Sequence, residues 1–560
     1  MQIKLNIPYA SLDGYTDLFI DYVNSFNKVG DFFEYPFDSQ GIYNSIADKK
    51  AGYNSGKISR LELSEILKTQ NKFFNSGESA FLNIEFLKDP DTFAIVTGQQ
   101  VGMLTGNLYT VIKALNAVQL SRSLSAKYTE FKFVPVFWLE ADDHDFLEIN
   151  NINVFDRDNK LTNLKYFERG TEKERYLTPA GRINLDEHIK IFKNTLKDTL
   201  LETEYSEQLF DFINRSFKEG IDLTTAFVRF FNYITEDTGL IFCNPSDKEI
   251  KKLLIPVFEK ELVSFPQSGE LIIEKSAELE LRDYVPQVKP KQINLFYTIN
   301  NNRHLVEFKE EKYSLRHTRH KFEKNDFFDL LYSVPENFSP NVILRPVCQD
   351  FLLPTIAYIG GPSEISYFAQ FKDVYGFFGM KMPVIYPRTS ITILEKRVES
   401  FLAKYEINFE DLFDETEAAK KLLGKMNEIN IDDEFSNFID ELNAVVYTYS
   451  QKFNNVDKNL VVNLKNKYDK YIENINIIKQ KFTESQVKQN ETTGIRLKSV
   501  IDSVYPDGNP QERFINVTYY LNKYGPDLVK ELLRVIEINK HNHQVISLSD
   551  TSIKEQTTLF

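Results

Sequence analysis

Two polar segments that directly follow short apolar runs constrain this chain more than any other feature. Residues 97–113 (TGQQVGMLTGNLYTVIK) and 137–145 (FWLEADDHD) place small, amide and ionisable side chains just after strand-like sequence. In a parallel α/β sheet, ligands bind in the crevice beyond the carboxyl ends of the strands. The two segments together therefore indicate an enzyme built on such a sheet.

The surrounding sequence predicts two strand–turn–helix–strand units. In the first, residues 93–96 form a strand, 97–105 a turn, a helix begins near Gly106, and 133–139 form the next strand. In the second, residues 355–359 form a strand and Gly360-Gly361 a turn. A helix then starts at Pro362 and runs to about Val374, and 382–386 form another strand.

These units predict an α/β fold, a Rossmann-like doubly wound parallel sheet with inserted connecting segments, plus an α-helical coiled-coil domain. The catalytic core would span residues 1–390, with insertions at about 151–340. An antiparallel helical domain would follow at 391–505, and a C-terminal helical segment at 506–560 would dock on the core.

The helical domain is predicted from alternating steps of four and three between apolar residues. A single helix over 442–482 would be about 60 Å long at 1.5 Å per residue, too long to pack wholly on a globular core. Either residues 395–435 fold back as an antiparallel partner or a second chain supplies one. We expect both, and a homodimer. Two sets have this spacing, and the steps 456–460–464–468 between them are all four, a stutter in the heptad pattern. The first set is Leu442, Val446, Tyr449, Phe453, Val456 and Leu460, and the second is Leu464, Tyr468, Tyr471, Ile475, Ile478 and Phe482.

Composition excludes several classes of protein. The formal charge of −14 argues against a broad nucleic-acid surface, which needs clustered positive charge. No apolar run is long enough to span a bilayer, and the N-terminus lacks the order of a signal peptide, so we expect a cytoplasmic protein. Cys243 and Cys348 are the only cysteines and are predicted to be buried thiols in strands.

The first polar segment is a candidate anion site. Glycines before a helix let backbone N–H groups approach an oxygen-rich ligand, and the helix N-terminus favours negative charge. Thr105 could cap the helix, while Thr110 and Lys113 lie one turn apart on its polar side. The alternative is a tight turn beside a solvated lysine. The candidate binding residues are Thr97, Gly98, Gln99, Gln100, Gly102, Thr105, Gly106, Asn107, Tyr109, Thr110 and Lys113.

The second polar segment is a candidate acid–base cluster. If the chain stays extended, Glu140, Asp142 and His144 share one face, with Asp143 and Asp145 on the other. Neighbouring carboxylates should favour protonated His144. A divalent metal site and an exposed acidic turn are the alternatives, and we assign no metal.

Later segments supply candidates for the same crevice. Arg388 follows the last predicted strand and could clamp an oxyanion or phosphate, or form a bridge to an acidic helix face. The remaining candidates are Trp138, Gln349, Asp350, Gly360, Gly361, Glu364 and Tyr367.

Several motifs resemble the BshC family, the cysteine ligases of bacillithiol biosynthesis. They are TGQQxGxxTGxLYTxxK (97–113), VFWxEADDHDxxExN (136–150), YIGGPxEIxY (358–367) and MPVIYPR (382–388), with Gln511-Glu512-Arg513 near the end. The resemblance implies a Rossmann-type core and a coiled-coil dimer. It also implies a reaction that joins the carboxyl group of cysteine to the amine of glucosaminyl malate.

The family core is similar to class I aminoacyl-tRNA synthetases, which form adenylates with an HIGH-type turn and a KMSKS-type loop. This chain instead has Thr105-Gly106-Asn107-Leu108 and Arg388-Thr389-Ser390 at those places. The resemblance makes ATP or ADP the candidate nucleotide. From the charge and the apolar runs, we expect no nucleic acid and no membrane as partner.

The residues and the resemblance together support a hypothesis for the mechanism. Thr110 and Lys113 would hold phosphate or malate oxygens, Asp142, Asp143 or Asp145 would orient the cysteine ammonium, His144 would transfer protons, and Arg388 would steady negative charge. The alternatives are a non-catalytic nucleotide-binding coiled-coil dimer, and an adenylate-forming enzyme with another acceptor.

Overall fold

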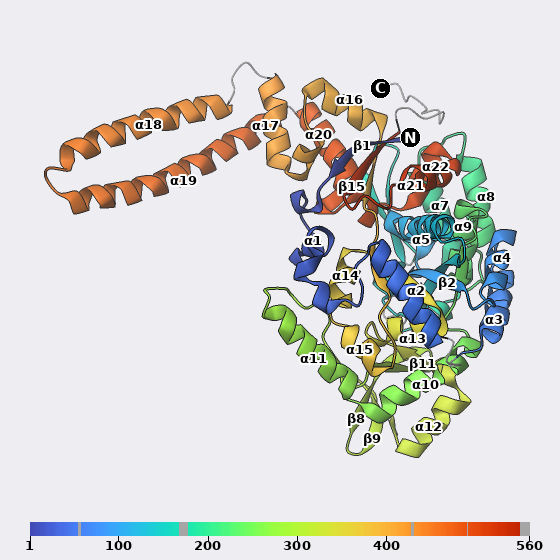
Figure 1. Ribbon diagram of the computed structural model, residues 1–560. Coiled ribbons are helices and arrows are strands. Elements are labelled where there is room, and N and C mark those ends of the chain that lie inside the picture. The colour runs from blue at the N-terminus through green and yellow to red at the C-terminus, as the bar shows by residue number, and fades with distance from the viewer. Residues whose placement is uncertain (54–57, 167–176, 427–430, 490, 549–560) are drawn as a thin grey trace. The chain divides into compact units, whose positions relative to one another are not determined.

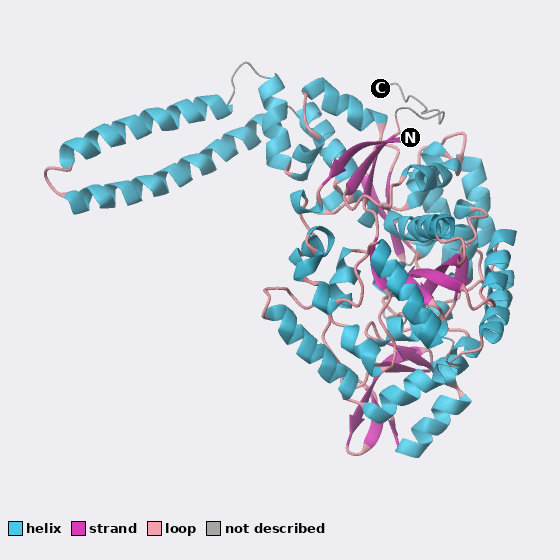
Figure 2. Cartoon of the chain, viewed as in Figure 1, coloured by secondary structure: helices cyan, strands magenta, loops and turns pink. Residues whose placement is uncertain are grey.

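The computed structural model describes residues 1–53, 58–166, 177–426, 431–489 and 491–548. They divide into two compact units. The first contains Met1–Thr392 and Glu512–Ile546, and the second consists mainly of Ile393–Gln511. Helices and strands alternate through the first unit, while the long hairpin of the second unit is helical (Figures 1 and 2).

A five-stranded parallel sheet forms the centre of the first unit. Its strands in spatial order are β13 (Val384–Pro387), β12 (Thr355–Gly360), β2 (Thr92–Gln100), β3 (Lys132–Glu140) and β6 (Ile241–Cys243). The chain passes from β2 to β3 on one side and later returns to β12 on the other. The strand order therefore reverses between β2 and β12, and this switch point is where a doubly wound sheet binds ligands.

Helices cover both faces of this sheet, so the central residues of its strands are buried and mostly apolar. On one face, Val134 and Val136 of β3 share a buried cluster with Leu63 and Leu67 of α3. On the other, Phe137 packs against Phe231 of α9, with ring centroids 5.2 Å apart. The main helices of the first unit are α2 (Ser39–Tyr53), α3 (Arg60–Phe73), α4 (Glu78–Phe86), α5 (Leu108–Lys127), α7 (His188–Thr199), α8 (Ser206–Ser216), α9 (Leu223–Thr235), α10 (Lys248–Ser264), α11 (Gln267–Glu280), α12 (Lys324–Ser333), α13 (Leu344–Leu352), α14 (Pro362–Phe368), α15 (Lys372–Phe377), α21 (Val517–Tyr524) and α22 (Asp527–Val535). The doubly wound parallel sheet predicted from sequence is confirmed.

Smaller sheets surround the central one. The chain between β3 and β12 contributes a hairpin of β4 (Asn151–Phe155) and β5 (Leu161–Lys165). It also contributes an antiparallel sheet of β10 (Lys321–Phe322), β9 (Lys312–Leu315), β8 (Asn302–Lys309), β7 (Leu295–Ile299) and β11 (Phe338–Pro340). A three-stranded sheet joins β1 (Gln2–Ile7), β15 (His543–Ser547) and β14 (Ile391–Leu394).

Several local predictions need correction. Residues 97–100 continue strand β2 rather than forming a turn, because their backbone pairs with β3 up to Gln100 opposite Glu140. The helix that starts at Pro362 ends at Phe368, and a second helix, α15, follows it. Cys243 lies in a strand as predicted, whereas Cys348 lies in helix α13; both are buried and free.

The second unit contains α16 (Lys396–Tyr405), α17 (Glu415–Met426), α18 (Ile431–Phe453), α19 (Lys458–Gln489) and α20 (Glu491–Val504). The prediction of a single helix over 442–482 is wrong. Helix α18 ends at Phe453 and α19 begins at Lys458, where the Asp457 carboxylate accepts from the Asn459 N–H. The two helices run side by side as an antiparallel hairpin (Figure 1). Among the described residues, no helix is long and apolar enough to cross a membrane.

Candidate active site

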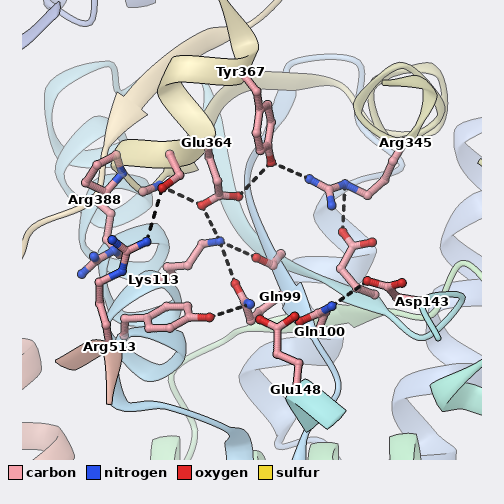
Figure 3. A pocket seen from close by; sticks show the side chains of 16 residues that line it. Gln99, Gln100, Lys113, Asp143, Glu148, Arg345, Glu364, Tyr367, Arg388 and Arg513 are labelled. Carbon is pink, nitrogen blue, oxygen red and sulfur yellow. Dashed lines mark hydrogen bonds and ion pairs between the residues drawn. The ribbon is translucent and has the colours of Figure 1, made fainter. Parts of the chain in front are cut away.

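A pocket of about 260 Å³ opens at the switch point of the central sheet (Figure 3). Its walls come from the ends of β2, β3 and β12, the start of α5, and the segment after β13. We call it the switch-point pocket. The predicted residues that line it are Gly98, Gln99, Gln100, Tyr109, Lys113, Glu140, Asp143, Gly361, Glu364, Tyr367 and Arg388. The two strand–turn–helix units thus meet at one cleft.

Lys113 and Glu364 form a buried ion pair that joins these two units. The Lys113 ammonium lies 2.7 Å from Glu364 Oε2 and donates to the Gly98 carbonyl at 2.6 Å. Lys113 is only 1% exposed, so the prediction of a polar or solvated helix face is wrong here. Burial alone would raise the pKa of Glu364, but the Lys113 charge holds that pKa below its usual value.

Glu364 also fixes the start of α14. Its carboxylate accepts from the Gly361 N–H at 2.8 Å, as in a capping box, and from the Tyr358 hydroxyl at 2.6 Å. The same Glu364 carboxylate therefore caps α14 and binds Lys113 in the pocket.

Glu140 and Arg345 form a second ion pair at the opposite side of the pocket, with Arg345 Nε 3.0 Å from Glu140 Oε1. Arg345 also donates to the Tyr367 hydroxyl at 2.8 Å (Figure 3). Burial raises the pKa of Glu140 to about 7, with Arg345 opposing the shift and Asp143 adding to it. The sequence gives no sign of Arg345, because residues 344–348 resemble a strand, whereas they belong to α13.

The acidic segment after β3 does not stay extended, because β3 ends at Glu140 and the chain turns. Asp142 accepts from Ser246 at 2.7 Å and pairs with Lys251 at 2.5 Å. Asp143 accepts from Gln100 at 2.6 Å. Asp145 is exposed and caps the short helix α6 (Phe146–Ile149) through the Glu148 N–H. The shared face predicted for alternate residues is therefore wrong.

His144 contacts Arg303 of strand β8, whose Nη1 lies 3.1 Å from His144 Nδ1. Burial lowers the pKa of His144 and the Arg303 charge lowers it further. Together they exceed the opposite effect of Asp143, which raises that pKa. The prediction that neighbouring carboxylates favour the protonated imidazole is thus wrong. Since a guanidinium only donates, Nδ1 accepts and the ring is neutral.

Arg388 reaches the pocket from a buried network. Its guanidinium pairs with Glu512 at 2.6 Å, and Glu512 also accepts from the Ile391 N–H at 2.7 Å. The Nε of Arg388 is buried without a hydrogen-bond partner in the described part of the chain. Arg513 lines the pocket beside it, so Glu512 and Arg513, for which the sequence alone suggests no role, belong to this site.

The glycine segment before α5 is packed by the chain itself. The Leu108 N–H donates to the Ile515 carbonyl at 2.9 Å, and the Asn516 amide donates to the Leu104 carbonyl at 2.9 Å. Asn107, not Thr105, is the N-cap of α5, and Gly106 has a φ of +68°, which favours glycine. The predicted residues that do not line the pocket here are Thr97, Gly102, Thr105, Gly106, Asn107 and Thr110.

Other predicted residues lie nearby or elsewhere. Trp138, Asp142 and His144 line an adjacent cavity. The Gly360 carbonyl accepts from the Arg388 N–H at 2.8 Å. Gln349 and Asp350 lie on α13 away from the pocket, because Asp350 turns to the Tyr375 hydroxyl at 2.7 Å. No group of three or more His, Cys, Asp or Glu side chains suited to a metal occurs in the part of the chain that the structure describes.

Comparisons with known proteins identify the family. The N-terminal Rossmann-like domain of bacillithiol biosynthesis BshC matches residues 1–389, and its C-terminal coiled-coil domain matches 391–548. A relative from Salinibacter ruber is 33% identical over 97% of this chain and 98% of its own length. The chain belongs to the BshC family.

Other BshC relatives cover the chain as fully. One from Chloroherpeton thalassium is 31% identical over 96% of this chain and 98% of its own length, and one from Bacillus cytotoxicus is 29% identical over 98% and 100%. These relatives carry the name "Putative cysteine ligase BshC". The chain is accordingly an enzyme of the ligase class, with a role in bacillithiol biosynthesis.

Proposed function

We propose that this protein joins the carboxyl group of cysteine to the amine of glucosaminyl malate, the last step in making bacillithiol. The observation that supports this best is the charge arrangement of the switch-point pocket. Arg388 and Arg513 lie on one side, while Asp143 and Glu148 lie towards the other (Figure 3). An acceptor with a malate dianion at one end and an amine at the other matches that arrangement.

The cationic side suits the malate. Arg388 is held in place by Glu512, so its guanidinium is oriented before a ligand arrives. Arg513 Nη2 makes a long contact of 3.3 Å to Ser363 Oγ, which a carboxylate oxygen could replace. Arginine is the side chain best matched to carboxylate and phosphate oxygens.

Amide formation needs an activated carboxyl group, and ATP is the co-substrate we propose. With the malate at Arg388 and Arg513, the cationic side chains left for the phosphates of ATP are Arg303, Lys289 and Lys291, which line the adjacent cavity. The packed glycine segment at residues 101–107 is less suited, because Ile515 and Asn516 already bind its polar groups. We further propose that the protein acts in the cytoplasm as a homodimer formed through α18 and α19.

The experiment is a coupled assay with purified protein, cysteine, glucosaminyl malate and ATP, with the product detected by mass. Cysteinyl-glucosaminyl malate should form, and its formation should require ATP. Serine in place of cysteine controls for donor identity, and glucosamine without malate tests the cationic side. Absence of the coupled product with the full chain would contradict the proposal.

A further inference from the structure

A second cavity of about 350 Å³ lies against the switch-point pocket. We call it the adjacent cavity. The residues that line both spaces are Glu140, Asp143 and Arg345. The Glu140–Arg345 ion pair therefore stands in the wall between two compartments, with a carboxylate that borders both.

The two compartments differ in chemistry. The pocket is lined mostly by charged and amide groups, whereas the adjacent cavity combines charged groups such as Arg303 with large apolar side chains, which are Trp138, Phe296 and Val342. Arg303 lies over the Phe296 ring, 3.9 Å from its centroid. Exposed Lys289 and Lys291 lie at the edge of the cavity. Such a space suits a small side chain attached to an anionic group.

We propose that the two compartments hold the two substrates of the ligation and that Glu140 is the catalytic base between them. The amine acceptor occupies the switch-point pocket, and the activated cysteinyl donor occupies the adjacent cavity. The assignment rests on the proposed function, since it divides that reaction's substrates between two observed spaces. Asp143 also borders both spaces. Burial raises the pKa of Asp143, but Arg303 and the Gln100 amide lower it below the usual value, so Asp143 is the weaker base of the two.

The cysteine carboxylate oxygen first attacks a phosphorus of ATP. Attack at the γ-phosphorus breaks the bond to the β-phosphate oxygen and gives an acyl phosphate and ADP, whereas attack at the α-phosphorus gives an acyl adenylate and pyrophosphate. The acceptor amine then attacks the carbonyl carbon, so a C–N bond forms and the C–O bond to phosphorus breaks. The phosphate or AMP leaves with the electron pair of that bond. The Glu140 carboxylate accepts the proton that the nitrogen loses.

The surroundings of Glu140 bring the pKa of its carboxylate close to neutral pH. Burial and two neighbouring carboxylates raise its pKa to about 7, and a base works best when its pKa lies near the operating pH. Arg345 keeps the deprotonated form accessible and holds its position. The charged and titratable groups that act on Glu140 are Arg345, Asp142, Asp143, Lys113, Arg303 and Tyr367.

The first test is the pH profile of kcat/KM for Glu140→Gln. The natural enzyme should gain activity as the pH rises through about 7, because Glu140 must be deprotonated. Glu140→Gln should lose that rise and about 10²- to 10⁴-fold of kcat, the usual contribution of a general base. Glu140→Asp should retain the rise. Glu274→Gln, exposed on α11, is the matched control and should behave as the natural enzyme.

The second test fills the adjacent cavity and does not depend on Glu140. Val342→Trp should raise KM for cysteine at least tenfold and leave KM for glucosaminyl malate within twofold. Val263→Trp, at a position 67% exposed on α10, is the steric control. Equal effects on both KM values, or a Glu140→Gln enzyme that keeps the rise with pH, would overturn the inference. If the natural chain makes no product, the proposed function itself fails.

Discussion

The interior of the first unit buries paired charged groups, whereas the helical hairpin of the second unit exposes apolar side chains. In the first unit, charged groups such as Lys113 and Glu512 are 1% and 0% exposed and are held by opposite charges. In the hairpin, apolar side chains such as Tyr471 and Val456 are 66% and 81% exposed. Buried charge is costly unless it is paired, and exposed apolar surface marks an interaction site.

The hairpin uses only part of its apolar surface internally. Leu442 and Val446 of α18 and Ile475 of α19 are half-buried between the helices. Tyr449 and Leu464, which belong to the same predicted pattern, are exposed. The first unit therefore pairs its buried charges internally, while the hairpin leaves apolar side chains exposed, on which the proposed homodimer would form. The predictions below test that contrast.

The largest expected effect is on the buried pair in the first unit. Glu512→Ala leaves Arg388 charged and buried without its partner, so the free energy of unfolding should fall by about 3–5 kcal/mol. Chemical denaturation measures it. Glu219→Ala, which removes an exposed partner of Lys190, is the control and should leave the unfolding midpoint unchanged.

The same pair predicts a sign for the acid dependence. Burial opposes ionisation of Glu512, but Arg388 lowers its pKa below the usual 4.5. Its contribution to stability is therefore complete above that value and is lost as the pH falls through the folded-state pKa. Glu512→Ala should unfold with less dependence on acid, and an unchanged dependence would show that Glu512 is protonated in the folded chain.

The next effect tests the hairpin. Tyr471→Glu places a charge on the exposed apolar surface of α19, where a partner helix would have to bury it. The proposed homodimer should then dissociate at least 100-fold more readily, measured by analytical ultracentrifugation, with the unfolding midpoint of the first unit unchanged. Lys470→Glu, at a neighbouring exposed position, controls for charge alone. A natural chain that sediments as a monomer at micromolar concentration would contradict the dimer.

A smaller effect is expected at His144. Arg303→Met removes the positive charge that faces the imidazole, so the pKa of His144 should rise, although burial still holds it down. Histidine NMR titration measures the shift. A fall in the pKa would mean that Arg303 supports the folded environment more than it repels the imidazolium.

Local sequence predicted the sheet well because each parallel strand is a continuous apolar run, as in residues 133–139. It also placed Lys113 and Glu364 at one cleft, because the carboxyl ends of parallel strands share an edge. Arg303 and Arg345 could not be found this way. They come from distant segments, and nothing in their own surroundings indicates that they face Asp143 and Glu140.

Burial and contacts in space also determine properties that the spacing of residues in the sequence does not predict. The expectation that His144 is protonated counted the carboxylates beside it in sequence, whereas Arg303 and desolvation dominate in space. The long helical pattern was recognised, but the break near Asn454 was not, because the steps of four between Val456 and Leu460 continue across it. Periodicity locates an apolar face; it does not show where a helix folds back.

The smallest effect compares the two regions by thiol reactivity. Cys243 and Cys348 are buried, and burial raises the pKa of both thiols, so neither forms a thiolate readily at neutral pH. A thiol reagent should therefore label the native chain only as fast as it unfolds. Val456→Cys places a thiol at an 81% exposed position in the hairpin and should label within the mixing time. Rapid labelling of the natural chain would show that the interior around β6 and α13 opens to solvent. The contrast between a closed core and an exposed hairpin would then be lost.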